Sequence, residues 1–473
     1  MAQSIVASSM MTKAILTVRN FIWSCRYAKS VPPSASQTPL VAYQQVWRSS
    51  LADRFSLRQD DINSTYRRRT LTTPITHGCR ISTTATRTTI TSRMSTVPGQ
   101  SADQTDVNHA EFSFEDLVQA YHDCRQHKRN TPTALAFEQN LERNLISLYA
   151  DLIDGSYTPG KSICFVVTKP KAREVWAADF RDRIAHHLLY NKVAPRFYAA
   201  FIHDSCACIP GRGTLYAANR LAAKIRSASQ NWSRPTYYLK CDLANFFVSI
   251  DKQVLQDQLA KRITEPFWIK LASTILWHDP RQHYDLRGAR ALMSRVPAHK
   301  RLTNQPAHLG LPIGNLSSQF FANVYLDALD QFCKHQIKAK HYIRYVDDFI
   351  ILHDSTDFLN DALEKISTWL PAKLGARLNT SKTILQPVAR GVDFVGHVIK
   401  PFHTTTRRRT VGEALRQMQQ AKEQDFHTKA NSYFGLLRQS SSSHHDRALL
   451  ARLALCRGFS VDRDLTKTFR KTS

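Results

Sequence analysis

Two adjacent carboxylates are the groups best placed to do chemistry in this chain of 473 residues, because apolar runs flank them on both sides. Asp347 and Asp348 lie in the segment 341–353, HYIRYVDDFIILH. Short runs rich in Tyr, Phe and Ile are typical of strands, so the segment predicts two strands joined by a tight acidic turn. Neighbouring carboxylates are costly to bury unless a cation neutralises them, and Mg²⁺ prefers oxygen ligands. A solvated Asp-Asp turn is the alternative interpretation.

A third carboxylate, far upstream, argues against a solvated turn. Asp242 follows a short apolar run in the segment 237–251, YYLKCDLANFFVSID. Two-metal phosphoryl transfer needs carboxylates from separate strands to converge, so that they bridge two ions about 3.5–4 Å apart. We therefore expect the strand that ends at Asp242 to lie beside the strands that meet at Asp347 and Asp348.

Together, the two acidic segments resemble the palm of a reverse transcriptase. The shared motifs are Y-x-D-D after an apolar strand, at 345–348, and D-x-x-x-F-F, at 242–247. The resemblance implies a right-hand polymerase of the α+β class, with fingers, a palm and a helical thumb. It also implies two Mg²⁺ ions, or Mn²⁺ in their place. The residues implied as metal ligands are Asp242, Asp347, the backbone carbonyl of Leu243, and Asp348 beside them.

The same resemblance implies roles for residues around the nucleotide. Arg173 matches an arginine that contacts the triphosphate, and Phe247 matches an aromatic ring that lies against the 2′ position of the sugar. Lys382, in the segment 378–383 (LNTSKT), matches a lysine that gives a proton to the leaving pyrophosphate. Further residues implied for the nucleotide are Gly314 and Gln319. Residues implied for template or primer are Lys169, Arg181, Arg212 and Tyr345.

Each of these residues also has a plain structural interpretation when it is taken alone. Lys169, Arg173 and Arg181 could belong to a solvated basic face instead of gripping phosphates. The glycine-flanked Arg212 could sit in an ordinary turn, and Lys382 could be a surface charge. Phe246 and Phe247 could both pack in the core, although we expect only Phe246 to do so. Only the combination of motifs favours the functional interpretation.

The segment 310–326, GLPIGNLSSQFFANVYL, narrows the resemblance to a subfamily. Most reverse transcriptases carry P-Q-G at this turn, whereas this chain has Ile313 between Pro312 and Gly314. With Ser318 and Gln319 further on, the segment resembles the reverse transcriptases of diversity-generating retroelements, in the group II intron-like superfamily. Those enzymes make errors at template adenines, and we expect Ile313 to be where fidelity is lowered. Ile313 as a filler of the palm core is the alternative.

Two other functions remain open at this point. One is a group II intron or retron-type reverse transcriptase, against which Ile313 and the Ser-Gln pair argue. The other, from a different class, is a catalytically idle RNA-binding protein on a reverse transcriptase scaffold. The presence of all three carboxylates argues against an idle protein.

Composition points to nucleic acid as the partner. The formal net charge is +27, from 65 Lys and Arg against 38 Asp and Glu, and such a charge implies a polyanionic ligand. Ribosomal, chromatin and membrane-surface proteins share this property, so charge alone does not decide. The resemblance implies template RNA, cDNA or primer, deoxynucleoside triphosphates and a small basic helical accessory protein. No run of 18 apolar residues exists, so we expect no membrane span.

The chain divides by composition into four expected parts. Residues 1–105 are basic and rich in Ser, Thr and Arg, and we expect them to be disordered. They are either upstream sequence before a true start at Met94 or an organellar transit peptide, so we expect a cytoplasmic protein with an organellar one as the alternative. Residues 106–235 are expected to form N-terminal helices and fingers, 236–400 the palm with fingers insertions, and 401–473 the thumb. The nine cysteines are scattered and are expected to be reduced thiols.

Overall fold

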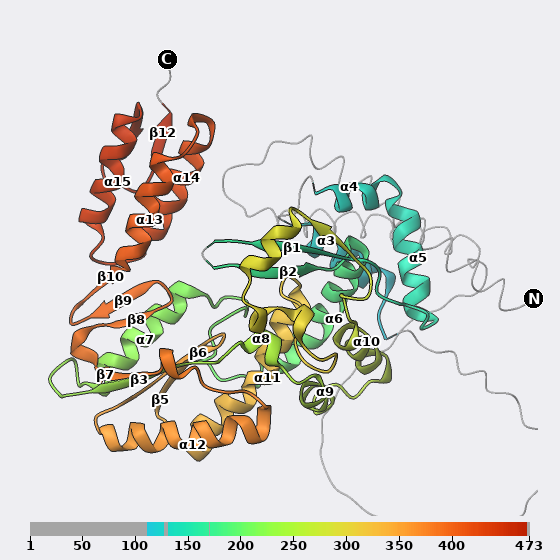
Figure 1. The fold of residues 1–473 in the computed structure, drawn as a ribbon, viewed down its shortest axis with the longest axis horizontal. Coiled ribbons are helices and arrows are strands. Elements are labelled where there is room, and N and C mark those ends of the chain that lie inside the picture. The colour runs from blue at the N-terminus through green and yellow to red at the C-terminus, as the bar shows by residue number, and fades with distance from the viewer. Residues whose placement is uncertain (1–110, 127–130, 170, 471–473) are drawn as a thin grey trace, which may run out of the picture. The chain divides into compact units, whose positions relative to one another are not determined.

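The computed structural model describes residues 111–126, 131–169 and 171–470, which belong to one compact unit, Ala110–Ser473. The basic extension expected over 1–105, including the alternative start at Met94, lies outside the described residues. The described part mixes helices and strands throughout (Figure 1). The expected α+β class is therefore confirmed.

The central sheet brings together strands that are far apart in the sequence. It contains β3 (Tyr237–Asp242), β5 (His341–Tyr345), β6 (Asp348–His353) and β7 (Ile384–Pro387), in the order β5-β6-β3-β7. All neighbouring strands are antiparallel, and β3 pairs with β6 so that Asp242 faces Asp348. The expectation that the two acidic segments lie side by side is confirmed.

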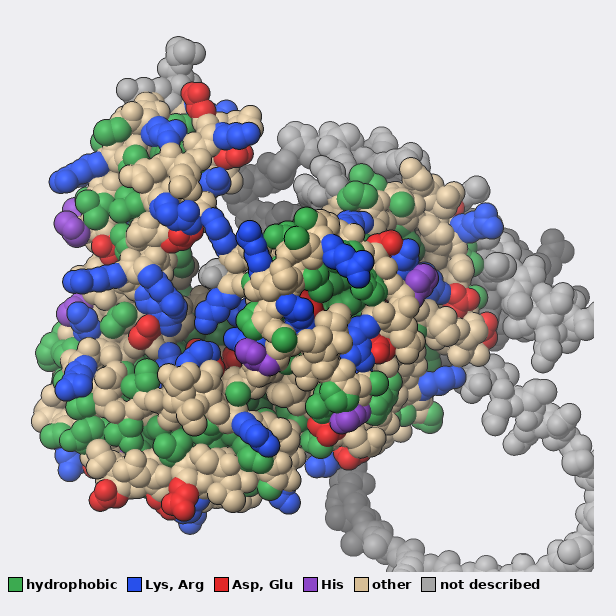
Figure 2. Space-filling view, viewed as in Figure 1, with side chains coloured by type: hydrophobic (Ala, Val, Ile, Leu, Met, Phe, Trp, Pro, Cys, Tyr) green, Lys and Arg blue, Asp and Glu red, His purple; other side chains and the backbone are tan. Residues whose placement is uncertain are grey.

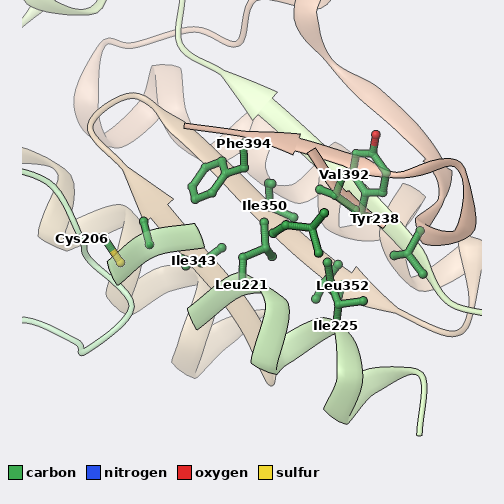
Figure 3. Packing of buried hydrophobic residues seen from close by; sticks show 12 residues of the cluster. Cys206, Leu221, Ile225, Tyr238, Ile343, Ile350, Leu352, Val392 and Phe394 are labelled. Carbon is green, nitrogen blue, oxygen red and sulfur yellow. The ribbon is translucent and has the colours of Figure 1, made fainter. Parts of the chain in front are cut away.

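Helices cover both faces of this sheet because successive strand residues alternate between the two faces. On one face lies α7 (Thr214–Ala228), whose Leu221 and Ile225 pack with Tyr238, Ile343 and Ile350 (Figure 3). On the other lies α12 (Thr356–Leu374), which contacts β3 and β6. We call this sheet, together with α7, α12 and α11 (Leu316–Gln331), the palm. This packing on both faces of the sheet fixes the positions of the strand ends, and therefore of the carboxylates.

A second sheet of three strands lies next to the palm. The hairpin of β1 (Ser162–Val167) and β2 (Arg173–Ala177) is joined by β4 (Tyr284–Arg287), which runs parallel to β1. We call it the fingers sheet. The helices around it and after β3 are α3 (Phe114–Arg125), α4 (Pro132–Gln139), α5 (Leu141–Ile153), α6 (Phe180–Tyr198), α8 (Phe246–Ser249), α9 (Lys252–Ala260) and α10 (Pro266–Trp277).

The C-terminal part is helical, as expected for a thumb. A small sheet, β8 (Val392–Phe394), β9 (His397–Lys400) and β10 (His403–Thr406), leads into the helices α13 (Arg408–Gln419), α14 (Glu423–Leu437) and α15 (His444–Cys456). These helices enclose their own core, which includes Met418, Phe426 and Phe434. The strands β11 (Phe459–Val461) and β12 (Thr468–Arg470) follow. The expected boundaries near 235 and 400 stay predictions.

Short 3₁₀ segments and one π-helical segment complete the described chain: η1 (Arg290–Arg295), η2 (Ala298–Lys300), η3 (Leu302–Asn304), η4 (Phe332–Gln336), η5 (Thr380–Lys382) and η6 (Val388–Arg390). None of the described helices is both long and apolar enough to cross a bilayer.

Candidate functional site

Three carboxylates at one end of the palm sheet line a single cavity of about 710 Å³. Asp242 is the last residue of β3, Asp348 is the first residue of β6, and Asp347 lies in the turn between β5 and β6. The turn is tight because Val346 adopts a left-handed backbone, with φ of +56°. Such a backbone is unusual for a β-branched residue and must be held by its surroundings.

Burial and repulsion from neighbouring charges raise the pKa values of Asp347 and Asp348. Burial raises the pKa of Asp347 to about 6, and the charges of Asp242 and Asp348 contribute to the rise. Burial also raises the pKa of Asp348, while the ammonium of Lys240, 4.0 Å from its Oδ2, counteracts part of that rise. Clustered carboxylates of this kind are stabilised by a bound cation.

Asp242 has polar partners in the segment between α12 and β7. Lys382 Nζ lies 2.5 Å from Asp242 Oδ1, and Asn379 Nδ2 donates to the same oxygen at 3.3 Å. The backbone N–H of Asn379 donates to the Asp242 carbonyl at 2.7 Å. The segment that carries Lys382 is thereby tied to the end of β3. The resemblance implied that Lys382 lies near the leaving pyrophosphate. The ion pair between Lys382 and Asp242 was not expected from the sequence.

The donor chemistry of the carboxylates fits a hard divalent cation, since carboxylate and carbonyl oxygens are what Mg²⁺ binds. Leu243, whose carbonyl was expected to be a ligand, also lines the cavity. In the described arrangement, however, no three His, Cys, Asp or Glu side chains are close enough to share one ion. Lys382 pairs with Asp242 Oδ1. A metal ion that binds this oxygen must therefore displace the ammonium or bind the oxygen alongside it.

A buried arginine next to the acidic turn is a site residue that the sequence analysis missed. Arg344, 1% exposed, pairs with the fully buried Asp330 of α11. Its Nη1 donates to the Val346 carbonyl at 3.0 Å, and its Nη2 donates to Ser205 Oγ at 2.9 Å. The hydrogen bond from Arg344 to the Val346 carbonyl therefore helps to hold the strained turn in place. The available signal was a single arginine inside an apolar strand, which rarely occurs without a buried partner.

The wall above the carboxylates forms where the fingers sheet docks on the turn before α11. The N–H of Trp176 donates to the Ile313 carbonyl at 2.7 Å. Gly314 has φ of +130°, and a Cβ there would meet Val175 Cγ1 at 2.8 Å, so only glycine allows this close approach. Arg173, Ile313, Gly314 and Gln319, all expected around the nucleotide, line the cavity.

The two adjacent phenylalanines after β3 have different environments. Phe246 is buried at 2% exposure, whereas Phe247 is partly exposed and lines the cavity. Their rings are 5.3 Å apart and edge-on. Tyr345, expected to contact template or primer, lines the cavity as well. The placement of Phe247 is the one that a ring against the sugar requires, and its role stays a prediction.

Three cations expected to bind template do not line the cavity. Arg181 pairs with Asp151 and lies over the Tyr157 ring, 5.3 Å from its centroid. Arg212 Nη1 donates to the carbonyls of Ile202 and Ser205, so it holds its own loop together. Lys169 is exposed between β1 and β2. None of these three side chains lines the cavity, and their contacts to the template stay predictions.

The palm sheet with carboxylates on adjacent strand ends, the fingers sheet above it and the helical C-terminal part define the right-hand polymerase class. Residues 168–399 match the family model described as Reverse transcriptase (RNA-dependent DNA polymerase). The matched segment contains both acidic motifs, so the match agrees with the family that these motifs predicted.

One curated relative and two solved structures show how far the similarity extends. The chain is 27% identical over 203 residues to the Retron Ec83 reverse transcriptase of Escherichia coli, a match that covers 41% of this chain and 54% of the relative. This chain thus spans about half the length of that relative. A telomerase from Candida albicans in complex with a TWJ fragment of telomeric RNA shares 12% identity, with a TM-score of 0.39, over 63% of this chain and 54% of that one. An apo telomerase from Candida tropicalis, truncated from its C-terminal domain, shares 13% identity, with a TM-score of 0.38, over 56% and 60%.

Proposed function

We propose that this protein is an RNA-directed DNA polymerase, which extends a primer with deoxynucleotides on an RNA template. The observation that carries the proposal is the convergence of Asp242, Asp347 and Asp348 on one cavity inside a reverse transcriptase domain. An idle RNA-binding scaffold would not need to keep three carboxylates whose mutual repulsion raises the cost of folding.

The side chains around the cavity have different roles in nucleotide addition. Asp242, Asp347 and the Leu243 carbonyl would hold two Mg²⁺ ions, with Asp348 beside them. When bound, the ions supply activation of the primer hydroxyl and neutralisation of the leaving pyrophosphate. Arg173 holds the triphosphate, and Lys382 carries a proton at Nζ that the pyrophosphate can accept.

Within this class we propose an error-prone enzyme of the diversity-generating type, which works with a template RNA and a small basic accessory protein. The support is Ile313, which lines the cavity and offers only apolar side-chain surface to a nucleotide. A retron-type enzyme is the second candidate, and the similarity to the Retron Ec83 reverse transcriptase favours it.

Primer extension by the full chain tests both levels of the proposal. A DNA primer annealed to an adenine-rich RNA is incubated with the four deoxynucleotides and Mg²⁺, and the cDNA is sequenced. We expect full-length cDNA with substitutions concentrated opposite template adenine. An even error spectrum would support the retron-type alternative, and no extension with either Mg²⁺ or Mn²⁺ would overturn the polymerase proposal.

A further inference from the structure

The segment 279–306, to which no sequence motif gave a role, forms part of the cavity wall. We call it the insert. It runs between α10 and the turn before α11, and it contributes β4 and the short segments η1, η2 and η3. Figure 1 shows it in yellow-green and yellow beside β1 and β2. Its strand β4 pairs in parallel with β1, from Ser162 opposite Tyr284 to Phe165 opposite Arg287.

The insert is fixed to β2 directly beside Arg173. Glu174, at 3% exposure, accepts hydrogen bonds from the backbone N–H of Leu302 at 2.8 Å and from Trp176 Nε1 at 3.2 Å. Leu302 packs with Trp176 in a small core. A buried carboxylate that accepts several hydrogen bonds is an expensive element to keep unless its partners must stay in place. Glu174 thus couples the fingers strand to the insert.

Two arginines of the insert serve its internal structure. Arg281 Nη1 donates to the carbonyls of Leu302 at 3.0 Å and Gln305 at 2.5 Å, which ties the beginning of the insert to its end. Arg301 Nε donates to the carbonyl of the buried Val296 at 2.7 Å. These hydrogen bonds tie the residues around 294–301 to the rest of the insert.

Two other cations of the insert are free and face the cavity. Arg295 and Lys300 line it together with Lys171 and Arg173 of the β1–β2 hairpin. All four are exposed or partly exposed, and none has an ion pair or side-chain hydrogen bond within the described ranges. Figure 2 shows Lys and Arg side chains gathered over this part of the molecule. Unpaired cations at the mouth of a cavity attract an anionic ligand.

We propose that Arg295 and Lys300 complete, with Lys171 and Arg173, the binding site for the triphosphate of the incoming nucleotide. This inference rests on the proposed polymerase function. A guanidinium beside an ammonium suits phosphate oxygens, because the guanidinium offers a planar fork of donors and the ammonium a compact charge. Template phosphates share this chemistry. The nucleotide is favoured because the same cavity is lined by Phe247 and Ile313, two residues that the resemblance to reverse transcriptases places around the nucleotide.

The test compares two double variants that remove the same charge from the same insert. Arg295→Ala with Lys300→Ala removes the cations on the cavity. Arg287→Ala with Arg290→Ala is the matched control, since both residues are exposed and neither lines the cavity. We expect the first variant to raise the KM for deoxynucleotides by about 10- to 100-fold, as loss of one or two charge-assisted hydrogen bonds implies. Its Kd for the annealed template-primer should change less than about threefold, and the control should match the parent in both.

Inorganic triphosphate serves as a probe that has neither sugar nor base. Its inhibition constant should rise by about the same factor as the KM in the cavity variant and stay constant in the control. Arg295→Lys with Lys300→Arg keeps both charges and should recover most of the loss. Equal melting temperatures check that the variants are folded.

The outcomes separate this inference from the polymerase proposal. A parent protein that extends no primer overturns the polymerase proposal. An active parent whose cavity variant keeps the parental KM and inhibition constant overturns the inference. A variant that loses template-primer affinity with an unchanged KM also overturns it and assigns the two cations to the template.

Discussion

Arg344 and Asp330 form a two-point ion pair inside the palm, with distances of 2.7 Å from Nε to Oδ1 and 2.6 Å from Nη2 to Oδ2. Tyr342 donates a further hydrogen bond to Asp330 at 2.6 Å. Because Arg344 also donates to the carbonyl of Val346, the pair connects α11 to the turn that presents Asp347. The geometry of the carboxylates therefore depends on a network of almost fully buried residues behind the acidic turn.

Arg344→Lys should weaken both folding and catalysis. The lysine keeps a positive charge but cannot serve Asp330, Ser205 and the turn at once, and disrupting a buried pair costs about 3–5 kcal/mol. We expect a lower melting temperature and a kcat reduced at least about tenfold, with little change in the KM for nucleotides. Lys365→Ala, which breaks the exposed Lys365–Asp361 pair, is the control and should change stability by less than about 1 kcal/mol. Parental stability and kcat in Arg344→Lys would show that the network is dispensable.

The raised pKa of Asp347 predicts a pH dependence of metal binding. A divalent ion binds the carboxylate and not the protonated acid, so affinity should rise as the pH passes upward through about 6. Calorimetry with Mn²⁺ at pH 6, in two buffers of different ionisation enthalpy, should detect proton release that Asp347→Asn diminishes. Metal affinity that is constant between pH 5 and 7 would contradict the assignment.

The same shift has a consequence for the stability of the metal-free protein. An acid whose pKa is higher in the folded than in the unfolded state stabilises the fold at low pH, and that stabilisation is lost as the pH rises through the folded pKa. The contribution of Asp347 should therefore decrease between about pH 4 and pH 6. Thermal unfolding of the parent and of Asp347→Asn over this range measures the contribution. The melting temperature of the parent should fall relative to that of the variant as the pH rises, and a constant difference would contradict the raised pKa of Asp347.

Phe247→Ala should relax discrimination against ribonucleotides. The ring lines the cavity where the sugar is expected, whereas its neighbour Phe246 is buried. We expect ribonucleotide incorporation to rise relative to deoxynucleotides, with little loss of deoxynucleotide use, in single-nucleotide extension. Phe246→Ala is the contrasting variant, which should lower stability by about 3–5 kcal/mol. An unchanged ratio of the two substrates in Phe247→Ala would mean that the ring only packs.

Ile313→Gln should lower misincorporation, most clearly opposite template adenine. A glutamine can hydrogen-bond to a correctly placed nucleotide, and an unpaired partner costs about 1–3 kcal/mol, so mispairs would be penalised. Activity should stay within about tenfold of the parent. Sequencing of cDNA from both proteins on one adenine-rich RNA provides the comparison, and identical error spectra would place the source of infidelity elsewhere or show that the enzyme is accurate.

The sequence was sufficient for the acidic centre because local patterns define it. Apolar runs that end at Asp242 and flank Asp347 predicted strands, and the chemistry of converging carboxylates predicted that the strands pair. The expectation that Phe246 packs in the core agrees with its burial, and Phe247 beside it is partly exposed.

The parts that could not be predicted depend on contacts between distant segments. Nothing local indicates that β4 adds to β1 in parallel, or that Glu174 is buried against Leu302. The same limit applies to Arg181 and Arg212, whose charge suggested phosphate contacts but whose partners are Asp151 and backbone carbonyls. A charged residue in the sequence does not reveal whether its partner is internal or external.

Primer extension by Asp347→Asn tests the central claim most directly. The substitution keeps the shape of the side chain and removes one charge from the proposed metal site, so extension should fall by several orders of magnitude. Binding of the RNA template should persist, because affinity for nucleic acid comes mainly from phosphate contacts elsewhere. Loss of extension with template Kd within about threefold of the parent is the predicted result. Extension by Asp347→Asn at a rate comparable to the parent would contradict the assignment of this cavity as the polymerase active site.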